Sequence, residues 1–309
     1  MRPRIVVVAG PTATGKTALG EALAKALGGE VVCADSRQVF RELEIGTGKP
    51  TAAERATRPH HLFDWRSLGE PASAGAWARE AARVCAEVAA RGATAVLVGG
   101  SGLYLSALRE GLHEEPPRDP ARRARLGDEL AALGLEALHE RLVALDPETA
   151  ARLAPNDRQR TLRALEIVEA TGRTLVQWRR EHPRTPLDAE WHSLQLTCEG
   201  SELSRRIEGR TRTMFAAGLI EETAALVARG AGEALATLRA IGYDEALGVI
   251  GGAVPLEAAL QRTIERTRQL AKRQRTWFRH RFHGEALGVE GRTEAETLAA
   301  ALEALGLAR

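Results

Sequence analysis

Residues 10–17 read GPTATGKT and constrain the fold of this chain more than any other segment. They fit the pattern G-x-x-x-x-G-K-[ST], which forms a phosphate-binding P-loop when a strand precedes it and a helix follows it. Residues 5–9 are an apolar strand-like run, and residues 16–27 are helical in pattern and end before Gly28 and Gly29. Glycines let backbone N–H groups surround phosphate oxygens, and the helix N-terminus adds partial positive charge. The sequence therefore predicts an α/β domain that begins with a phosphate cradle.

Strands and helices are expected to alternate after the P-loop. Residues 30–34 and 93–98 are short apolar runs of the kind that is buried on both faces of a parallel sheet, and residues 76–90 are helical in pattern. This alternation favours an α/β fold with a doubly wound parallel sheet. A further strand is expected at residues 192–197 and a last long helix at residues 256–282.

The character of the sequence changes at Glu114-Glu115-Pro116-Pro117. From there to Pro186 the patterns are helical, over residues 120–133, 135–145, 147–153 and 157–170. We therefore predict an all-helical insertion domain over residues 114–186. Residues 1–113 would form the first part of the P-loop core, and residues 187–309 its remainder with the C-terminal helix.

The composition excludes several classes of protein. The formal net charge of +2 names no partner by itself, and the three scattered cysteines form no zinc or disulfide pattern. No stretch approaches the roughly 20 apolar residues that a membrane span needs, and the run before the P-loop is too short for a signal peptide. We expect an intracellular protein of a reducing cytoplasm that does not associate with membranes.

Polar residues follow the second and third predicted strands, where ligand-binding loops are expected. Asp35 is a carboxylate on the metal side of the phosphate, a base, or a cap of the next turn. Ser101 lies in the GGSG sequence at residues 99–102, whose N–H groups and hydroxyl either face the same anion or form a plain tight turn. The adjacent His60 and His61 are expected to line a pocket or a loop rather than to bind a metal, because sequence neighbours rarely converge on one ion.

The last predicted helix carries a strongly cationic face. Residues 262–281 contain seven arginines and Lys272 against one acid, Glu265, beside an apolar seam of Ile264, Ala271 and Phe278. A solvated charged helix usually mixes both signs, so this ratio favours a polyanion partner. Arginines of the predicted insertion would extend the footprint: Arg118, Arg122, Arg123, Arg125, Arg158, Arg160 and Arg163. A phosphate cradle combined with a basic surface predicts an enzyme that acts on nucleic acid.

Seven segments in order resemble the bacterial tRNA dimethylallyltransferase, or tRNA isopentenyltransferase, family. They are GPTATGKT at 10–17, ADSRQVF with IGTGKP at 34–50, HHLFD at 60–64, VGGSGLYL at 98–105, NDRQRTLRALE at 156–166, IGYDE at 241–245 and TRQLAKRQRTWFR at 267–279. The resemblance spans nearly the whole chain, and this many motifs in one order are highly specific. Three positions depart from the family pattern: Phe40 stands where Tyr is common, Thr14 where Ser is frequent, and Ser101 where Thr is usual.

The resemblance implies a defined reaction. A dimethylallyl group would pass from dimethylallyl diphosphate to N6 of the adenosine immediately 3′ of the anticodon, in tRNAs that read codons beginning with U. The P-loop would then hold a leaving diphosphate with Mg²⁺ rather than a nucleotide, and would stabilise the charge that the leaving group gathers in the transition state. The tRNA would bind through its anticodon stem-loop, with the target base flipped out of the stack.

The same resemblance assigns roles to individual residues. The expected catalytic set is Asp35 as the general base, Ser101 as a hydroxyl donor and Arg210 as a diphosphate contact. The diphosphate would lie against Gly10, Pro11, Thr12, Ala13, Thr14, Gly15, Lys16 and Thr17, and the Thr17 hydroxyl would bind Mg²⁺. Residues expected at the tRNA are Asp35, Ser36, Arg37, Gln38, Ser101, Arg123, Gln159, Arg160, Thr161, Leu162, Arg163, Lys272, Arg273 and Arg275.

Three alternatives stay open on the residues alone. An isopentenyltransferase for free adenine nucleotides shares the P-loop and the base, but it has no use for a helical insertion and a basic helix. A P-loop small-molecule kinase would bind ATP at residues 10–17 and transfer a phosphoryl group. A nucleic-acid-binding module with a vestigial P-loop is disfavoured by the intact Lys16-Thr17 pair. We expect a monomer, because no exposed apolar repeat suggests association.

Overall fold

Two units make up the chain in the computed structural model, which describes residues 2–114, 116 and 119–308. Unit 1 comprises Met1–Arg109 and Leu187–Arg309, and unit 2 comprises Glu110–Pro186. The division therefore falls at residue 110, where the sequence placed it at residue 114. Of the residues discussed at that boundary, Glu115, Pro117 and Arg118 lie outside the described residues.

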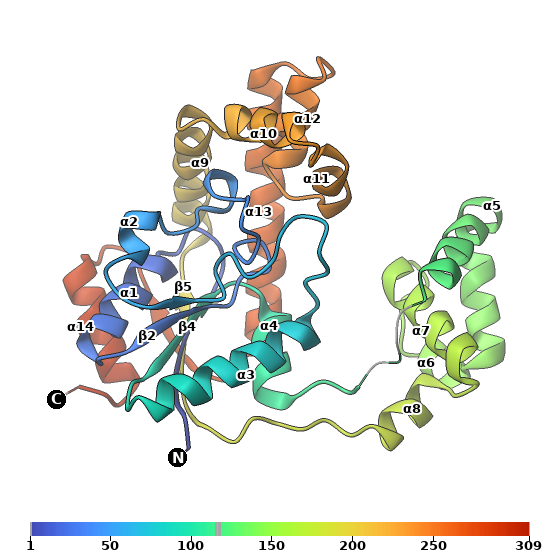
Figure 1. The fold of residues 1–309 in the computed structure, drawn as a ribbon, viewed down its shortest axis with the longest axis horizontal. Helices are drawn as coiled ribbons and strands as arrows, with labels where there is room; N and C mark the ends of the chain where they lie inside the picture. The colour runs from blue at the N-terminus through green and yellow to red at the C-terminus, as the bar shows by residue number, and fades with distance from the viewer. Residues whose placement is uncertain (1, 115, 117–118, 309) are drawn as a thin grey trace. The chain divides into compact units, whose positions relative to one another are not determined.

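Unit 1 is built on a six-stranded sheet in the order β3-β2-β4-β1-β5-β6, and each pair of neighbouring strands is parallel (Figure 1). The strands are β1 (Arg4–Ala9), β2 (Glu30–Cys33), β3 (His60–His61), β4 (Ala95–Gly99), β5 (Glu190–Thr197) and β6 (Glu285–Gly288). The central strands β2 and β4 are buried at every position, as the unbroken apolar runs predicted. The edge strands β3 and β6 were not predicted, because β3 has only two residues and β6, Glu-Ala-Leu-Gly, lacks the β-branched apolar run that marks β2.

Helices cover both faces of this sheet, which confirms the doubly wound fold. They are α1 (Lys16–Ala26), α2 (Ala52–Arg55), α3 (Ala74–Ala90), α4 (Gly102–Glu110), α9 (Gly200–Ala216), α10 (Leu219–Ala228), α11 (Gly232–Leu238), α12 (Tyr243–Ile250), α13 (Leu256–Arg281) and α14 (Glu294–Ala304), with a 3₁₀ turn η1 (Ile45–Thr47). Helices α1 and α14 share one core with alternate strand residues such as Val6 and Val96. On α3, Trp77 is fully buried, donates to the Cys33 carbonyl and stacks on Tyr104 of α4.

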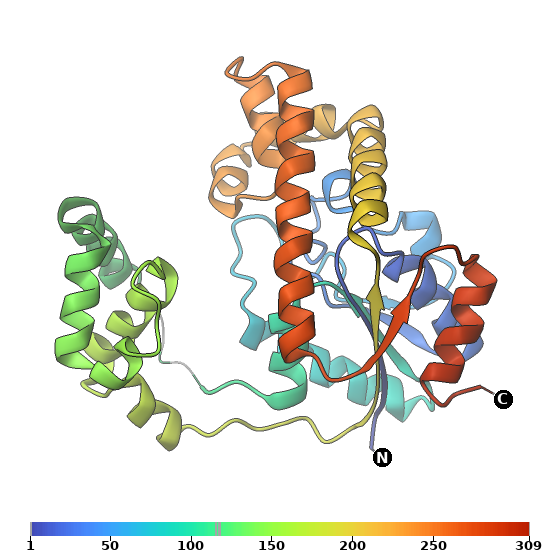
Figure 2. The same cartoon turned by 180° about the vertical axis from the view of Figure 1, so that it is seen from behind.

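The basic helix α13 runs beside α9, and α12 packs on it (Figure 2). Its predicted apolar seam is confirmed, since Ile264, Ala271 and Phe278 are each no more than 2% exposed. The opposite side of the helix is polar and cationic at successive exposed positions. This arrangement holds α13 in unit 1 and leaves six of the seven arginines of residues 262–281 exposed, while Arg266 pairs with Asp244 and Glu245.

Every element described in unit 2 is a helix, as the sequence predicted. These are α5 (Pro120–Leu145), α6 (Pro147–Ala150), α7 (Arg158–Thr171) and α8 (Leu175–Glu181). Gly134 has φ 81 and ψ 170, so α5 consists of two helical stretches that meet where the sequence expected a break. The helix α8 was not predicted; Thr174 and Gln177 begin it with a reciprocal capping box. Across the residues that the structure describes, no helix is long and apolar enough to cross a membrane.

Candidate active site

A cavity of about 1060 Å³ lies in unit 1 where three loops meet. The loops follow the carboxyl ends of β1, β2 and β4, which the sheet register sets side by side: Ala9 is opposite Gly99, and Cys33 is opposite Val98. The rest of the wall comes from helices α9, α12 and α13, from residues 46–48 at η1, from Leu219 and from residues 239–242. The carboxyl edge of an open parallel sheet is the usual place for a ligand in α/β proteins.

The backbone of the P-loop requires small residues. Gly10 has φ 143, and a Cβ on it would lie 2.6 Å from the Leu196 carbonyl oxygen of β5. Gly15 has φ 85 and begins α1, and Ala13 also has a positive φ of 64. Left-handed residues between right-handed ones are the backbone pattern that gathers N–H groups into an anion-binding nest.

The predicted P-loop residues divide into cavity wall and internal support. Those on the wall are Thr12, Ala13, Gly15, Lys16 and Thr17. Thr14 is buried, and its hydroxyl donates to the Pro11 carbonyl at 2.9 Å. The same carbonyl accepts from the Lys16 ammonium at 2.6 Å. Thr14 and Pro11 therefore hold the shape of the loop, and the side chain of Thr14 does not face a ligand.

Among the described residues, the cavity wall holds seven cationic side chains and one carboxylate, Asp35, and the pKa is lowered in three of the cations. Burial lowers the pKa of Lys16 to about 8; Asp35 opposes this shift and Arg210 adds to it. Burial also lowers the pKa of Arg37 and Arg210, and Asp35 opposes the shift in both. Cations that are short of water and of counter-charge gain stability from an anion placed between them. The electrostatics of the cavity therefore favour an anionic ligand.

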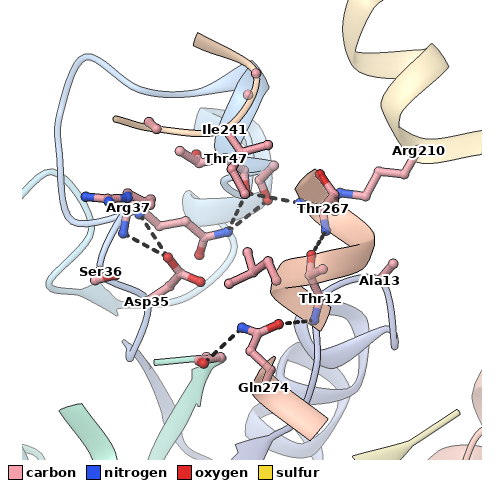
Figure 3. A pocket seen from close by; sticks show the side chains of 18 of the residues that line it. Thr12, Ala13, Asp35, Ser36, Arg37, Thr47, Arg210, Ile241, Thr267 and Gln274 are labelled. Carbon is pink, nitrogen blue, oxygen red and sulfur yellow. Dashed lines mark hydrogen bonds between the residues drawn. The ribbon is translucent and has the colours of Figure 1, made fainter. Parts of the chain in front are cut away.

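Asp35 lies on the wall directly after β2 and uses only one of its carboxylate oxygens in the fold. Its Oδ1 accepts from the backbone N–H of Arg37 at 2.8 Å and from that of Gln38 at 3.4 Å (Figure 3). Within the described part of the chain, Oδ2 has no hydrogen-bond partner. The sequence left open whether Asp35 caps the turn or faces a ligand. Both are possible at once, because Oδ1 caps the turn and Oδ2 is left for a ligand.

The Gln38 side chain is committed to the fold. Its Nε2 donates to the carbonyls of Thr47 and Gly48, each at 3.1 Å. Gln38 still lines the cavity, and its Oε1 has no hydrogen-bond partner among the described residues. Ser36 and Arg37 line the cavity beside it.

Ser101 faces the cavity with its hydroxyl but not with its backbone N–H. That N–H donates to the Ala34 carbonyl at 3.2 Å, so of the two alternatives that the sequence left open it has the structural one. The hydroxyl oxygen accepts from the Ser36 N–H at 2.8 Å and keeps its own proton to donate. A Cβ on Gly99 would lie 2.0 Å from the Ala34 carbonyl oxygen, so this glycine serves the close approach of β2 and β4.

Arg210 reaches the P-loop from α9, where the sequence expected a diphosphate contact. Its Nη1 donates to the Thr12 hydroxyl at 2.9 Å, and its Nη2 donates to the Thr47 carbonyl at 3.1 Å (Figure 3). A Cβ on Gly48 would lie 2.2 Å from Nη2, so this glycine makes room for the guanidinium. The structure thus brings Lys16, Asp35, Ser101 and Arg210 to one cavity.

Sequence reasoning missed Gln274 of α13. Its amide oxygen accepts from the Thr12 N–H at 2.9 Å, directly on the P-loop. The signal was its spacing: Gln274 is three residues after Ala271 and four before Phe278, which puts it on the buried seam rather than on the cationic face. A polar residue inside an apolar seam marks a specific hydrogen-bond partner.

The paired histidines contact different carboxylates. His60 contacts Glu21, and the Nε2 of His61 lies 2.6 Å from Glu30. In the ranges that the structure covers, no group of three or more His, Cys, Asp or Glu residues could hold a metal ion. The two histidines form the edge strand β3 beside β2, so the expectation of a loop is wrong, and neither of them lines the cavity described above.

The residues predicted at the tRNA fall in both units. On α13, Arg273 lines the cavity, while Lys272 and Arg275 are exposed outside its wall. In unit 2, Thr161 and Leu162 are 0% and 6% exposed, so contact of their side chains with RNA is a wrong expectation; both face the core. Glu166 accepts from the guanidinium groups of Arg123 and Arg163. Two predicted residues of unit 2 are exposed at the start of α7, Gln159 and Arg160.

Comparison with known sequences gives consistent matches. The IPP transferase family model matches residues 38–281. The chain is 46% identical to a tRNA dimethylallyltransferase of Halorhodospira halophila over 99% of both proteins. It is 49% identical to the tRNA dimethylallyltransferase of an Anaeromyxobacter species, over 89% of this chain and 91% of that protein.

Solved structures with the same fold carry related descriptions. A tRNA isopentenylpyrophosphate transferase of Staphylococcus epidermidis superposes with a TM-score of 0.71 at 31% identity, over 99% of each chain. A eukaryotic dimethylallyltransferase described as acting on tRNA has a TM-score of 0.79 at 26% identity, over 94% of this chain and 74% of its own.

Proposed function

Because the chain belongs to the IPP transferase family, whose curated relatives are tRNA dimethylallyltransferases, we propose that it prenylates tRNA. The dimethylallyl group of dimethylallyl diphosphate passes to N6 of the adenosine immediately 3′ of the anticodon, in tRNAs that read codons beginning with U. The products are N6-dimethylallyladenosine and diphosphate. One observation carries the proposal: Lys16, Arg210 and Asp35 line the same cavity. The two cations can bind a leaving diphosphate, and the carboxylate can accept a proton.

The diphosphate binds at the P-loop. Its oxygens accept from the loop N–H groups, from Lys16 and from Arg210. As the carbon–oxygen bond breaks, negative charge collects on the departing diphosphate, and donors fixed in advance stabilise that charge most in the transition state. The lowered pKa of Lys16 supports this role, because an arriving anion restores the counter-charge that the buried ammonium lacks.

The adenine amine attacks the carbon that the diphosphate leaves. A carbon–nitrogen bond forms, and the amine gives up one proton, which Asp35 accepts on Oδ2. The hydrogen bonds to Oδ1 support this role because they fix the carboxylate before the substrate arrives. Ser101 donates its hydroxyl proton to the adenine or the diphosphate.

The donor set at the P-loop suits Mg²⁺. Thr17 lies on the cavity wall and its side chain is exposed there. Mg²⁺ commonly takes few protein ligands and completes its shell with phosphate oxygens and water. We assign it the Thr17 hydroxyl and oxygens of the diphosphate, where the ion would neutralise charge on the leaving group.

The tRNA approaches with its anticodon stem-loop. Lys272, Arg273 and Arg275 on α13, together with Gln159 and Arg160 on α7, offer groups for its phosphates. The protein acts in the cytoplasm, where tRNA is available, and as a monomer. Its three free cysteines are buried, which suits a reducing compartment.

A transfer assay tests the proposal against its rivals. The protein is mixed with Mg²⁺ and labelled dimethylallyl diphosphate, with tRNA or AMP as the acceptor, and separately with labelled ATP. We expect label in tRNA, at the adenosine next to the anticodon. Label only in AMP would identify an enzyme for free nucleotides, and phosphoryl transfer from ATP without prenylation would identify a kinase. No transfer in any arm would reject the proposal.

A further inference from the structure

One side chain of α13 joins two loops of the cavity. The Gln274 amide oxygen accepts from the Thr12 N–H at 2.9 Å, and its Nε2 donates to the Gly100 carbonyl at 3.0 Å. Both distances are typical of good hydrogen bonds. Figure 3 shows the amide of Gln274 pointing to Thr12 on one side and to the loop after β4 on the other.

The loop after β4 is shaped to receive α13. A Cβ on Gly100 would lie 2.5 Å from the Gln274 Nε2, so a glycine at this position admits the amide. A Cβ on Gly102 would lie 2.3 Å from the Trp277 ring, which is three residues further along the same side of the helix. Two glycines of the GGSG sequence therefore leave room for two side chains of α13, Gln274 and Trp277.

The two loops that Gln274 joins serve opposite ends of the reaction. Thr12 belongs to the P-loop, and its hydroxyl also accepts from Arg210. Gly100 precedes Ser101, whose hydroxyl accepts from the backbone N–H of Ser36, the neighbour of Asp35. A single amide thus connects the diphosphate side of the cavity to the side that holds the proposed base.

We propose that Gln274 is a positioning residue that fixes the spacing between the diphosphate cradle and the Asp35 side of the cavity. The inference rests on the proposed function, because only a transfer between two bound groups makes this spacing matter. Glutamine suits the role, since its amide carries an acceptor and a donor at one tip. Its neighbours Arg273 and Arg275 are exposed and suit RNA binding. Gln274 is half-buried, and its amide bonds to two loops of unit 1 instead.

The test compares two variants of Gln274 with a matched control. Gln274→Met keeps the length of the side chain and removes both hydrogen bonds. Gln274→Glu keeps an acceptor for the Thr12 N–H and removes the donor to Gly100. The control is Gln261→Met, on the same helix, where the native side chain is exposed and bonds only to Glu257 among the described residues. Each protein is titrated with inorganic pyrophosphate to count competent sites, and then assayed for transfer to tRNA.

We expect Gln274→Met to lower kcat per pyrophosphate-binding site by about 10- to 100-fold, because small errors of position are costly in bimolecular chemistry. Its KM for tRNA should stay within about threefold of the wild type, because the phosphate contacts of the helix are intact. Gln274→Glu should lose rate in the same way, since one side of the connection is broken. The control should keep the wild-type kcat.

Several results would overturn the inference. A wild-type kcat in Gln274→Met would show that the connection has no effect on transfer. A raised KM for tRNA with unchanged kcat would make Gln274 an RNA contact like its neighbours. Loss of pyrophosphate binding in both variants would show that Gln274 has only a structural role. If only Gln274→Met loses pyrophosphate binding, the kcat and the KM for tRNA of Gln274→Glu decide the question instead. If wild type and control transfer nothing to tRNA, the proposed function fails, and this inference fails with it.

Discussion

At the scale of single residues, Asp35 shows how one side chain combines support and chemistry. Its Oδ1 closes the turn after β2 by accepting from two backbone N–H groups. Short acidic side chains favour this local bonding, which is why the sequence alone could not separate a cap from a base. Because the turn uses one oxygen, the other is left for a ligand.

Asp35→Asn separates these two tasks. The asparagine oxygen can still accept from the turn, but the side chain no longer takes a proton. We expect kcat for transfer to tRNA to fall by about 10²- to 10⁴-fold, the usual contribution of a general base. Pyrophosphate should bind as well or more tightly, since a negative charge has left the cavity. Turnover at the wild-type rate would remove Asp35 as the base.

The second residue-scale prediction concerns Lys16 and pH. With a pKa of about 8 in the free protein, the ammonium loses its proton as the pH rises above 8. The bound diphosphate requires the charged form of Lys16. Above pH 8 the lysine must take up a proton when the diphosphate binds, so the affinity for the diphosphate falls as the pH rises. Below pH 8 the lysine is already charged and binding takes up no proton. The substrate itself contributes little, because a phosphate's second ionisation lies near pH 6.

Calorimetric titration with dimethylallyl diphosphate between pH 7 and 10, in buffers of different ionisation enthalpy, measures this proton uptake. Lys16→Arg keeps its charge throughout this range and should show an affinity that is independent of pH. The same flat profile in the wild-type protein would contradict the assignment.

At the scale of elements, α13 combines three surfaces on one helix. A buried seam fixes it to unit 1, Gln274 and Arg273 reach the cavity, and exposed arginines remain for a polyanion. The sequence predicted the seam and the charged face, because both follow from helical spacing. It could not predict the bonds of Gln274, whose partners at residues 12 and 100 are fixed only by the packing of α13 against two loops.

The charged face of α13 can be tested by reversal. Arg273→Glu combined with Arg275→Glu should weaken tRNA binding by at least about tenfold and reduce the slope of log K against log salt by about 2. Filter binding at several salt concentrations measures both quantities. Arg229→Glu combined with Arg292→Glu, two exposed reversals outside α13, is the charge-matched control. Equal effects of the control and the α13 variant would show that only net charge matters.

At the scale of the whole molecule, the two units have separate hydrophobic cores. The core of unit 1 includes Val6, Leu23 and Leu196, and that of unit 2 includes Leu142 and Leu165. The cavity is lined entirely by residues of unit 1. Stability and small-ligand binding should therefore respond separately to changes in the two units.

Leu142→Ala tests this separation. Leu142 is fully buried in unit 2, so its truncation should cost that unit about 2–5 kcal/mol of unfolding free energy. Differential scanning calorimetry should show a lower transition for unit 2, while pyrophosphate still raises the transition of unit 1 as in the wild type. Leu23→Ala should give the reverse pattern. A single transition that both changes shift equally would contradict independent units.

The sequence by itself determined the features that depend on neighbours along the chain. The P-loop, the buried parallel strands, the helical insertion and the seam of α13 follow from local motifs and from periods of two or 3.6 residues. Its main errors came where such a pattern says nothing about partners: His60 and His61 form a strand rather than a loop, and Thr161 and Leu162 are buried. A motif match transfers a stretch of residues, but it does not say which of them face the ligand.

Only the tertiary structure decided how these parts form one site. The register of β1, β2 and β4 sets three loops at one edge of the sheet, so Lys16, Asp35 and Ser101 share a cavity. Arg210 and Gln274 reach that cavity from helices far along the chain. Hydrogen bonds between residues so distant in sequence depend on how whole helices pack against the sheet, and no local pattern of residue types encodes that packing.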